Sequence, residues 1–237
     1  MSPQSKNQLV LGLCIFLGLS VLGLSIAASP DNFRRHDRGV SVKGLAERIV
    51  PADRAIWPIT FTATSNEIEG LYVTLDSDRE IVQRFLYEND FAPEEITANP
   101  PLINDKLAAN YGNKAVNVRF TGQQTLSVYT DRVDLVRSTM ARMTELGKSG
   151  IILGGARYGE QPDFLFTGLN EIKPSMIEEA TRNAREVALK FARDSESRLG
   201  KIRSARQGQF SITNRDQNTP HLKKVRVVST IDYFLID

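Results

Sequence analysis

One long amphipathic helix, predicted over residues Lys173–Lys201, constrains the fold more than any other feature of the sequence. Apolar or small side chains recur every three or four residues on one face, which must be buried; they are Met176, Ile177, Ala180, Ala184, Val187, Ala188, Phe191 and Leu199. The opposite face carries charges of alternating sign suited to water, at Glu178, Arg182, Glu186, Lys190, Asp194 and Arg198. Pro174 suits the first turn and Gly200 the end of such a helix. At 1.5 Å per residue it would be roughly 40 Å long, so we expect it to pack across a sheet.

The chain beyond residue 38 alternates predicted strands with helices. Alternating apolar residues predict strands at 40–48, 55–64, 91–102, 116–129, 151–158, 164–167, 202–212 and 225–236, and helical spacing predicts further helices at 68–89 and 133–147. The order ββα, ββα, β(β)α, ββ with short turns predicts an α+β fold with largely antiparallel sheets. We expect the first two strands to form a hairpin, and Pro58 to place the second strand at an edge or a bulge.

An apolar run without charges extends from Leu9 to Ala28 after the single cation Lys6. It is long for the core of a signal peptide and long enough to span a bilayer. Residues 1–28 are therefore predicted to be either a cleaved signal peptide, with a small-x-small site at Ser25-Ile26-Ala27, or an uncleaved membrane anchor. Both alternatives predict export, and they differ in whether this segment is cleaved from the mature protein.

The remaining chain is predicted to consist of a polar tether, residues 29–38, and one folded domain, residues 39–237. An apolar content of 41% is ordinary for a globular protein. The only cysteine, Cys14, lies in the apolar run, so the folded part contains no disulfide and no thiolate site.

Several stretches of this domain resemble the SIMPL-domain family, which includes bacterial periplasmic proteins. The stretches that carry the resemblance are Val40–Glu47, Ala55–Thr64, Phe164–Pro174, Ala180–Ala188, Leu199–Ile202 and Lys224–Tyr233. The resemblance covers about Gly39 to Asp237. It implies an α+β fold, export to the cell envelope and, as in some members, assembly into a large ring or channel-like oligomer. A loosely defined role in oxidative-stress defence is attached to some relatives. The family has no established catalytic residues, so the resemblance assigns none here.

The residues themselves indicate no catalytic, cofactor or metal site. The two histidines, His36 and His221, have no cysteine beside them, so no zinc or nucleophile constellation can be built. Gly154-Gly155 fits neither a phosphate-binding loop nor a dinucleotide fingerprint. The acid pairs Asp76/Asp78 and Glu94/Glu95 are adjacent in sequence, as on a solvated face.

Charge is unevenly distributed along the chain although the net charge is only +2. Residues 64–105 contain ten acids and two bases, whereas residues 182–226 contain twelve bases and four acids. On separate surfaces these segments would favour head-to-tail contacts between subunits or docking on anionic headgroups; facing each other in one monomer, they would do neither. Nucleic acid is a poor partner, because the basic segment lacks a recognition motif and has only Phe210 as an aromatic candidate.

We therefore expect a non-enzymatic SIMPL-domain protein of the cell envelope, of structural or interaction type. Its expected partners are further copies of itself, as a homo-oligomer, and the membrane through residues 9–28 if these are uncleaved. The alternative is a periplasmic binding module for an apolar or lipid-like ligand of unknown identity. Its groove would lie between the long helix and the sheet and would be lined by Trp57, Phe61 and Phe191, although core packing is the more ordinary role for these residues.

Overall fold

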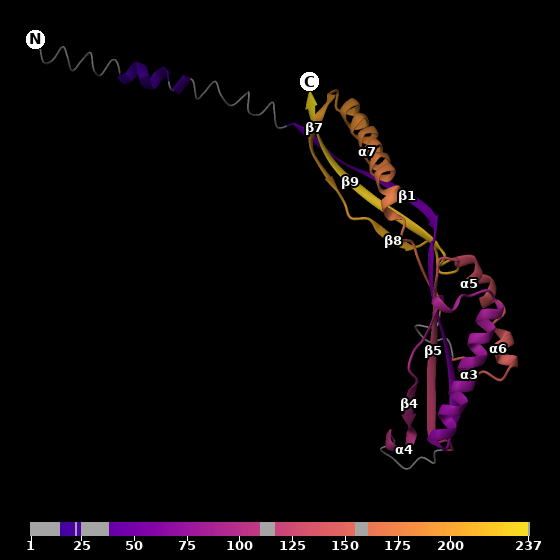
Figure 1. The fold of residues 1–237 in the computed structure, drawn as a ribbon. Coiled ribbons are helices and arrows are strands. Elements are labelled where there is room, and N and C mark those ends of the chain that lie inside the picture. Colours follow the sequence, from indigo (N-terminus) through magenta and orange to yellow (C-terminus); the bar gives the residue numbers. More distant parts are fainter. Residues whose placement is uncertain (1–14, 22, 25–37, 110–116, 155–160, 237) are drawn as a thin grey trace, which may run out of the picture. The chain divides into compact units, whose positions relative to one another are not determined.

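The computed structural model describes residues 15–21, 23–24, 38–109, 117–154 and 161–236. The chain divides into two compact units (Figure 1). Unit 1 comprises residues 1–46, 175–210 and 227–237, and unit 2 comprises residues 47–174 and 211–226. Helices and antiparallel sheets occur together, which confirms the predicted α+β class. The sequence pattern had indicated one domain over 39–237 and gave no sign of this division.

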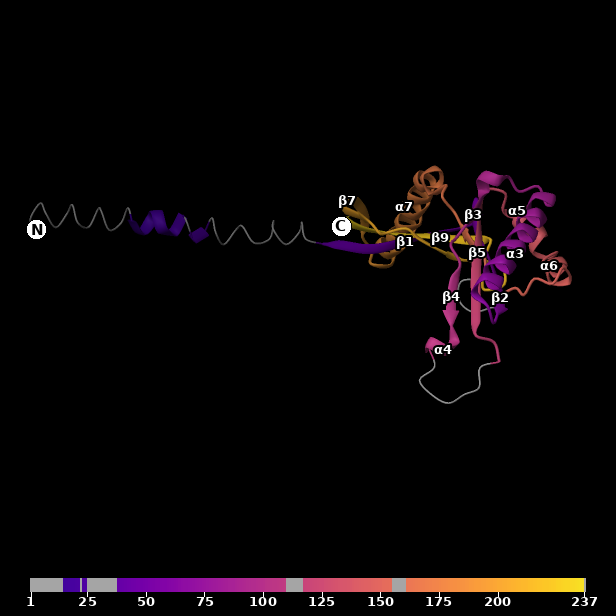
Figure 2. The same cartoon turned by 60° about the horizontal axis from the view of Figure 1, so that its bottom comes forward.

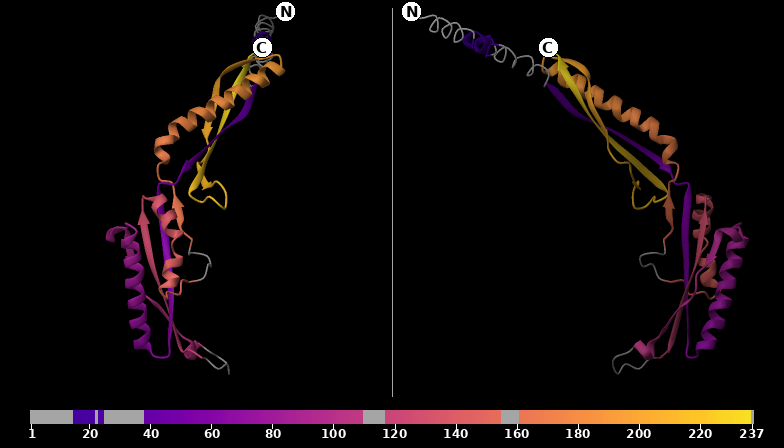
Figure 3. Two further views of the ribbon diagram at one scale, coloured as in Figure 1. Left: turned by 90° about the vertical axis from the view of Figure 1, so that its right-hand side faces the viewer. Right: turned by 60° about the vertical axis from the view of Figure 1, so that its left-hand side comes forward.

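Unit 1 is built from one sheet and one long helix. Its strands follow the order β1, β9, β7, and the bounds of its elements are Gly39–Pro51 for β1, Leu169–Asp194 for α7, Arg198–Gln207 for β7 and Leu222–Ile236 for β9. β7 and β9 pair antiparallel, with Arg198 opposite Ile236 and Gln207 opposite Ser229. Figure 3 shows α7 lying along one side of these strands, as the sequence predicted for the long helix.

The contact between α7 and the sheet is made by small residues. The buried residues of α7 recur at every fourth position: Met176, Ala180, Ala184, Ala188 and Ala192. Two of them, Ala180 and Ala184, lie over Gly44 of β1, where a Cβ atom would stand 1.8 Å from the carbonyl oxygen of Ala180 and 2.5 Å from the amide nitrogen of Ala184. The helix backbone therefore touches the strand, which only glycine at position 44 permits. The predicted charge ladder of α7 is exposed.

The limits of this helix differ from the prediction of Lys173–Lys201. α7 begins at Leu169, so Pro174 is inside it, and it ends at Asp194 because Glu196 takes a left-handed φ of 53°. The N–H of Ser197 closes the last turn on the carbonyl of Ala192 (2.9 Å), and Gly200 belongs to β7.

Two residues assigned to the buried face of this helix are exposed. Val187 and Phe191 are 41% and 55% exposed. Each stands one residue before an alanine of the stripe, which turns it about 100° away from the sheet. The buried face is thus narrower than the apolar pattern suggested.

Unit 2 contains a five-stranded antiparallel sheet with helices on one side. The sheet has the order β3, β5, β2, β6, with β4 also paired to β5. The bounds are Arg54–Ser65 for β2, Ile68–Glu88 for α3, Pro93–Glu95 for the 3-10 helix η1, Ile96–Ala98 for β3, Leu102–Asp105 for β4, Lys106–Ala109 for α4, Phe120–Thr130 for β5, Val133–Met140 for α5, Thr144–Lys148 for α6, Asp163–Leu165 for β6 and Ser211–Asn214 for β8. Figures 1 and 2 both show α3, α5 and α6 on the same side of β5. β8 pairs with the part of β9 that belongs to this unit.

The core of unit 2 lies between this sheet and α3. Alternate residues of β2 and β5 and one face of α3 are fully or almost fully buried: Trp57, Ile59, Phe61, Leu71, Leu75, Val82, Leu126 and Val128. Gly122 of β5 lets α3 approach, because a Cβ atom there would stand 2.7 Å from Cδ1 of Leu75. The alternation expected for a half-buried strand is confirmed in β2.

The predicted hairpin between the first two strands is wrong. β1 pairs with β9, whereas β2 pairs with β5 and β6. The turn between them bonds elsewhere: the N–H of Ala52 donates to the carbonyl of His221 (2.8 Å), and that of Asp53 to the carbonyl of Leu165 (2.8 Å). The short turn between β1 and β2 therefore did not imply that these two strands pair with each other, because each of them pairs with strands that are distant in the sequence.

Pro58 occupies a local edge, as expected. β5 runs along the whole of β2, but β6 covers only residues 54–56 on the other side. Pairing on that side resumes at Phe61, which bridges to Leu153. Pro58 lies between these two contacts, where no described residue pairs with β2 on that side, so the missing N–H disrupts none of the described pairing.

Four further predicted segments have different bounds. The strand over 91–102 is the 3-10 helix η1 followed by the short strand β3, the helix over 133–147 is two short helices, α5 and α6, and the strand over 202–212 is divided into β7 and β8. Of the strand over 151–158, only the bridge at Leu153 is seen, and 155–158 lie outside the described residues.

The predicted apolar run Leu9–Ala28 is described only at residues 15–21 and 23–24, which are helical and carry exposed side chains. Among the residues described, no helix is both long enough and apolar enough to cross a membrane. Residues 9–14, 22 and 25–28 of the run lie outside the description, as does the tether except Arg38.

We expect Gly44→Ala to destabilise unit 1 by about 3 kcal/mol or more, because the new methyl group would collide with helix backbone that cannot move as a side chain can. Urea unfolding followed by circular dichroism measures this. Gly147→Ala is the control: Gly147 lies in α6 with open space around it, so alanine should be neutral or stabilising by up to about 1 kcal/mol. Equal unfolding midpoints for Gly44→Ala and the unmodified chain would contradict the proposed packing.

Candidate functional site

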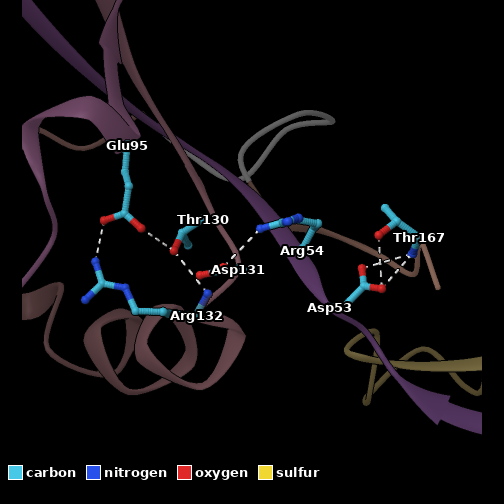
Figure 4. Close-up of polar contacts among 7 residues, drawn as sticks. All are labelled: Asp53, Arg54, Glu95, Thr130, Asp131, Arg132 and Thr167. Carbon is cyan, nitrogen blue, oxygen red and sulfur yellow. Dashed lines mark hydrogen bonds and ion pairs between the residues drawn. The ribbon is translucent and has the colours of Figure 1, made fainter.

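A group of interacting polar side chains lies in unit 2, where β2 begins and β5 and β6 end (Figure 4). The pairing of Ala55 with both Thr130 and Phe164 brings these three strand ends together. We call this group the strand-end cluster; it comprises Asp53, Arg54, Glu95, Thr130, Asp131, Arg132 and Thr167.

Glu95 is the centre of one half of the cluster. Its carboxylate accepts hydrogen bonds from the hydroxyl of Thr130 (2.5 Å) and from the N–H of Ala92 (2.8 Å). The guanidinium of Arg132 forms an ion pair with the same carboxylate and also donates to the carbonyl of Asp90 (2.8 Å). Both carboxylate oxygens of Glu95 therefore have partners.

These contacts fix the charge state of Glu95. Partial burial by itself would raise the pKa of the carboxyl group. The hydrogen bonds from Thr130 and Ala92, followed by the hydrogen bond and positive charge of Arg132, outweigh burial and lower the pKa below its ordinary value. Glu95 is thus an anion at neutral pH, whereas a general acid or base needs a pKa close to the working pH.

Asp53 is the centre of the other half. Its carboxylate accepts from the N–H (2.9 Å) and the hydroxyl (3.1 Å) of Thr167 and from the N–H of Gly168 (2.9 Å). Gly168 directly precedes the first residue of α7, so Asp53 satisfies backbone donors at the start of this helix from a distant part of the sequence. Arg54 and Asp131 connect the two halves through an exposed ion pair of 3.2 Å.

The geometry of the strand-end cluster is that of a structural clamp. The carboxylate oxygens of Glu95 and Asp53 all accept hydrogen bonds from neighbouring backbone or side-chain donors. The cluster holds β2, β5, η1 and the start of α7 in place, and we assign it no chemical step.

Unit 2 also has two small cavities that share Gln161. The first, of about 240 Å³, is lined by Arg137, Met140, Gln161, Pro162, Phe164, Asn218, Pro220 and His221. The second, of about 320 Å³ and more apolar, is lined by Pro58, Thr60, Met143, Thr144, Gly147, Leu153, Gly154 and Gln161. Gly154 of the predicted pair Gly154-Gly155 thus borders a cavity, while Gly155 lies outside the described residues.

His221 stands in the first cavity as a lone imidazole. Its ring meets Phe164 edge to face, with centroids 6.2 Å apart. Burial lowers the pKa of His221 and the nearby positive charge of Arg137 lowers it further, against an opposing effect of Asp134. In the part of the chain that the structure describes, no three His, Cys, Asp or Glu side chains are grouped so as to hold a metal ion. The other histidine, His36, is outside that part.

The three residues expected to line a groove under the long helix do not come together. Trp57 and Phe61 are fully buried in the core of unit 2, the more ordinary role considered for them, while Phe191 is exposed on α7 in unit 1. The close contact of α7 with Gly44 leaves no room for a ligand there. A groove between the long helix and the sheet is therefore excluded as the site of the predicted apolar ligand.

The acid pairs have ordinary surroundings. Asp76 is exposed and pairs with Arg79 on the same helix at 3.2 Å, while partial burial raises the pKa of Asp78. Glu94 is exposed, so only Glu95 belongs to the strand-end cluster. Sequence reasoning missed the rest of that cluster because its members are far apart in the chain. The one available signal was the dipeptide Asp-Arg at two predicted strand ends, 53–54 and 131–132.

The two charged segments are sorted between the units. The acid-rich segment 64–105 lies wholly in unit 2, and seven of its ten acids are exposed. Eight of the twelve bases of segment 182–226 lie in unit 1. Counting described residues only, unit 1 has ten bases and six acids, a net charge of +4, and unit 2 has fifteen bases and eighteen acids, a net charge of −3.

A model of the SIMPL family, described as a protein of unknown function (DUF541), matches residues 40–227. The chain belongs to the SIMPL family. The match begins in β1 and ends in β9, so it includes both units of this SIMPL protein. No curated protein sequence matches the chain.

Two glycines within the SIMPL-like stretches have steric roles, and a third contributes a backbone hydrogen bond. Gly44 admits α7 to the sheet, and the N–H of Gly168 donates to Asp53. A Cβ atom at Gly200 would stand 2.9 Å from the carbonyl oxygen of Phe234, so β7 approaches β9 closely there. The stretches that carry the family resemblance therefore include contacts on which the fold depends.

We expect Glu95→Gln to lower the free energy of unfolding by about 1–3 kcal/mol at pH 7, because the amide group cannot replace the charged acceptor of Arg132 and Ala92. The folded-state pKa of Glu95 is lowered, so its stabilisation is fully present above the unfolded value of 4.5 and is lost as pH falls through the folded value. The difference between the two proteins in urea unfolding should therefore shrink below pH 4.5.

Glu94→Gln, at the exposed neighbouring position, is the control and should change stability by less than about 0.5 kcal/mol. A stability difference between Glu95→Gln and the unmodified chain that stays constant from neutral to acid pH would show that the charge of Glu95 is not what matters.

Proposed function

We propose that this SIMPL-family protein is a non-enzymatic structural or interaction protein of the bacterial cell envelope, exported to the periplasmic side, that self-associates into a large oligomer. The observation that carries self-association is the sorting of charge between the units, +4 against −3 among described residues. Oppositely charged surfaces on one chain favour head-to-tail contacts between copies. Export is supported by the apolar run Leu9–Ala28, which acts as a membrane anchor if it is not cleaved.

A link to oxidative-stress defence comes only from the family resemblance. In this chain such a role would be indirect, since the single cysteine, Cys14, lies in the apolar run and no thiol is available in residues 38–237. An assembled particle would act through its surfaces or its interior.

Light scattering of the full chain in mild detergent tests self-association. We expect an oligomer at low ionic strength that dissociates near 1 M salt, where the screening length falls to about 3 Å. Glu69→Lys combined with Glu80→Lys, on exposed positions of α3 in unit 2, should weaken assembly. The matched pair Glu178→Lys and Glu186→Lys, on α7 in the positive unit 1, should not. A monomer at every salt concentration would refute self-association.

A second function, binding of a small apolar molecule, is favoured by the cavity of about 320 Å³ in unit 2. Leu153, Met143 and Pro58 supply apolar walls there, in place of the excluded groove. The uncharged fluorescent probe N-phenylnaphthylamine should bind, and Leu153→Trp, which fills the cavity, should abolish the fluorescence increase. Ile152→Trp, at the adjacent exposed position, is the control and should leave it unchanged. Equal fluorescence in both variants would rule out this cavity as the binding site.

A further inference from the structure

Three chain segments meet at one end of unit 1, which we call the terminal end. The N–H of Leu235 in β9 donates to the carbonyl of Arg38 (3.0 Å), directly before β1. Arg198, the first residue of β7, stands opposite Ile236, the last residue of β9. Figure 3 shows the C-terminus, the start of β7 and the last turn of α7 together at this end in both views. The domain therefore begins and ends at the same place.

Large apolar side chains are exposed at the terminal end. Phe191, in the last turns of α7, Ile202 in β7 and Ile236 in β9 are 55%, 51% and 52% exposed. A fourth, Phe234, is half-buried under the guanidinium of Arg203, which lies 5.8 Å from its ring centroid. Phe234 and Ile236 face away from α7, because Ile231 and Tyr233 of the same strand pack against its alanines, so exposed apolar side chains are present on both sides of this end. Exposed apolar side chains at one end of a folded unit are typical of interaction surfaces.

The same end is rich in bases. β7 has the sequence RLGKIRSARQ, in which four of ten residues are basic and none is acidic. Its bases, Arg198, Lys201, Arg203 and Arg206, are all exposed. The nearby acids are fewer: Asp194 and Glu196 precede β7 in sequence, and Asp232 of β9 accepts a hydrogen bond from Ser204 (2.5 Å) and forms an ion pair with Arg206 at 3.5 Å. Apolar side chains among bases form the pattern of surfaces that lie in the headgroup region of anionic bilayers.

The length of the tether, residues 29–38, indicates which partner lies within reach of this surface. Ten residues, 29–38, separate the apolar run from β1. A chain spans at most about 3.5 Å per residue, so the terminal end lies within about 35 Å of the last residue of the run. If the run is in a bilayer, the tether holds this end of the domain next to the headgroups at a high effective concentration.

We propose that the terminal end of unit 1 docks on an anionic phospholipid bilayer, with β7 supplying the charge and Phe191, Ile202 and Ile236 the apolar contact. The docking rests on the membrane segment of the proposed function and does not depend on self-association. Because the tether keeps the terminal end at a high effective concentration next to the headgroups, a contact too weak to hold a free domain on the bilayer can form here.

The test is hydrogen exchange on the full chain reconstituted into nanodiscs of phosphatidylcholine alone, or of equal parts phosphatidylcholine and phosphatidylglycerol. Exchange in β7 should be several-fold slower in the anionic discs, whereas β2 of unit 2 serves as an internal reference and should not change. High salt should remove the protection. Phe191→Ser should reduce it without altering the net charge.

Charge reversal separates docking from a general effect of net charge. The triple variant Arg198→Glu, Lys201→Glu, Arg203→Glu should lose the protection of β7. The matched variant Arg84→Glu, Lys148→Glu, Lys173→Glu places the same charge change on exposed positions of unit 2 and should keep it. Circular dichroism confirms that both variants are folded.

The outcomes distinguish docking from the proposed function. If the chain co-purifies with the discs but β7 is not protected from exchange, docking is wrong and the proposed membrane anchor stands. Equal protection in both lipids overturns docking as well, and indicates that a second copy of the chain covers β7. Failure to co-purify with either disc overturns both docking and the anchor, whereas self-association is judged separately by light scattering.

Discussion

The contact between α7 and β1 is the constraint on which unit 1 depends. Helices usually pack on sheets through large side chains, but here alanines every fourth residue and Gly44 bring the two backbones together. Little apolar area is available from such small residues, so stability depends on close van der Waals contact along the helix. The same closeness removes any space for a ligand between helix and sheet. Function in unit 1 must therefore be sought on its outer surface.

Unit 2 follows a different principle. Large side chains such as Trp57 and Leu71 fill its core, and polar groups at the strand ends satisfy one another. In the strand-end cluster the donors of Arg132 and Thr167 meet the carboxylates of Glu95 and Asp53, so the charges are used in holding chain segments. A lowered pKa in such a cluster reflects structural pairing, and it is weaker evidence for catalysis than a raised pKa in a cleft would be.

The surfaces of this SIMPL protein are more distinctive than its interior. Unit 1 is positive, and its bases on β7 stand among exposed apolar side chains, whereas the exposed acids are concentrated around α3 in unit 2. The proposed self-association and the proposed membrane docking both depend on this separation, and both would weaken as salt screens it. They differ in their need for apolar contact, because only docking requires Phe191 and its neighbours to leave water. The salt dependence of each process is therefore less informative than its dependence on these side chains.

The class of the fold, its long helix with one charged face, the strand β2 and the two oppositely charged segments could be predicted from the amino-acid sequence, because these follow from local periodicity and composition. The sequence also predicted the local edge at Pro58, since a missing donor restricts pairing. The strand pairing, the division of the chain into two units and the membership of the strand-end cluster became known only from the three-dimensional structure. Those features depend on contacts between distant segments, such as Asp53 with Thr167 or Gly44 with Ala180, which no local pattern encodes. The exposure of Phe191 was likewise not predictable from a local pattern. Its apolar side chain fits the helical spacing, but it faces water because the neighbouring Ala192 holds the position on α7 that packs against the sheet.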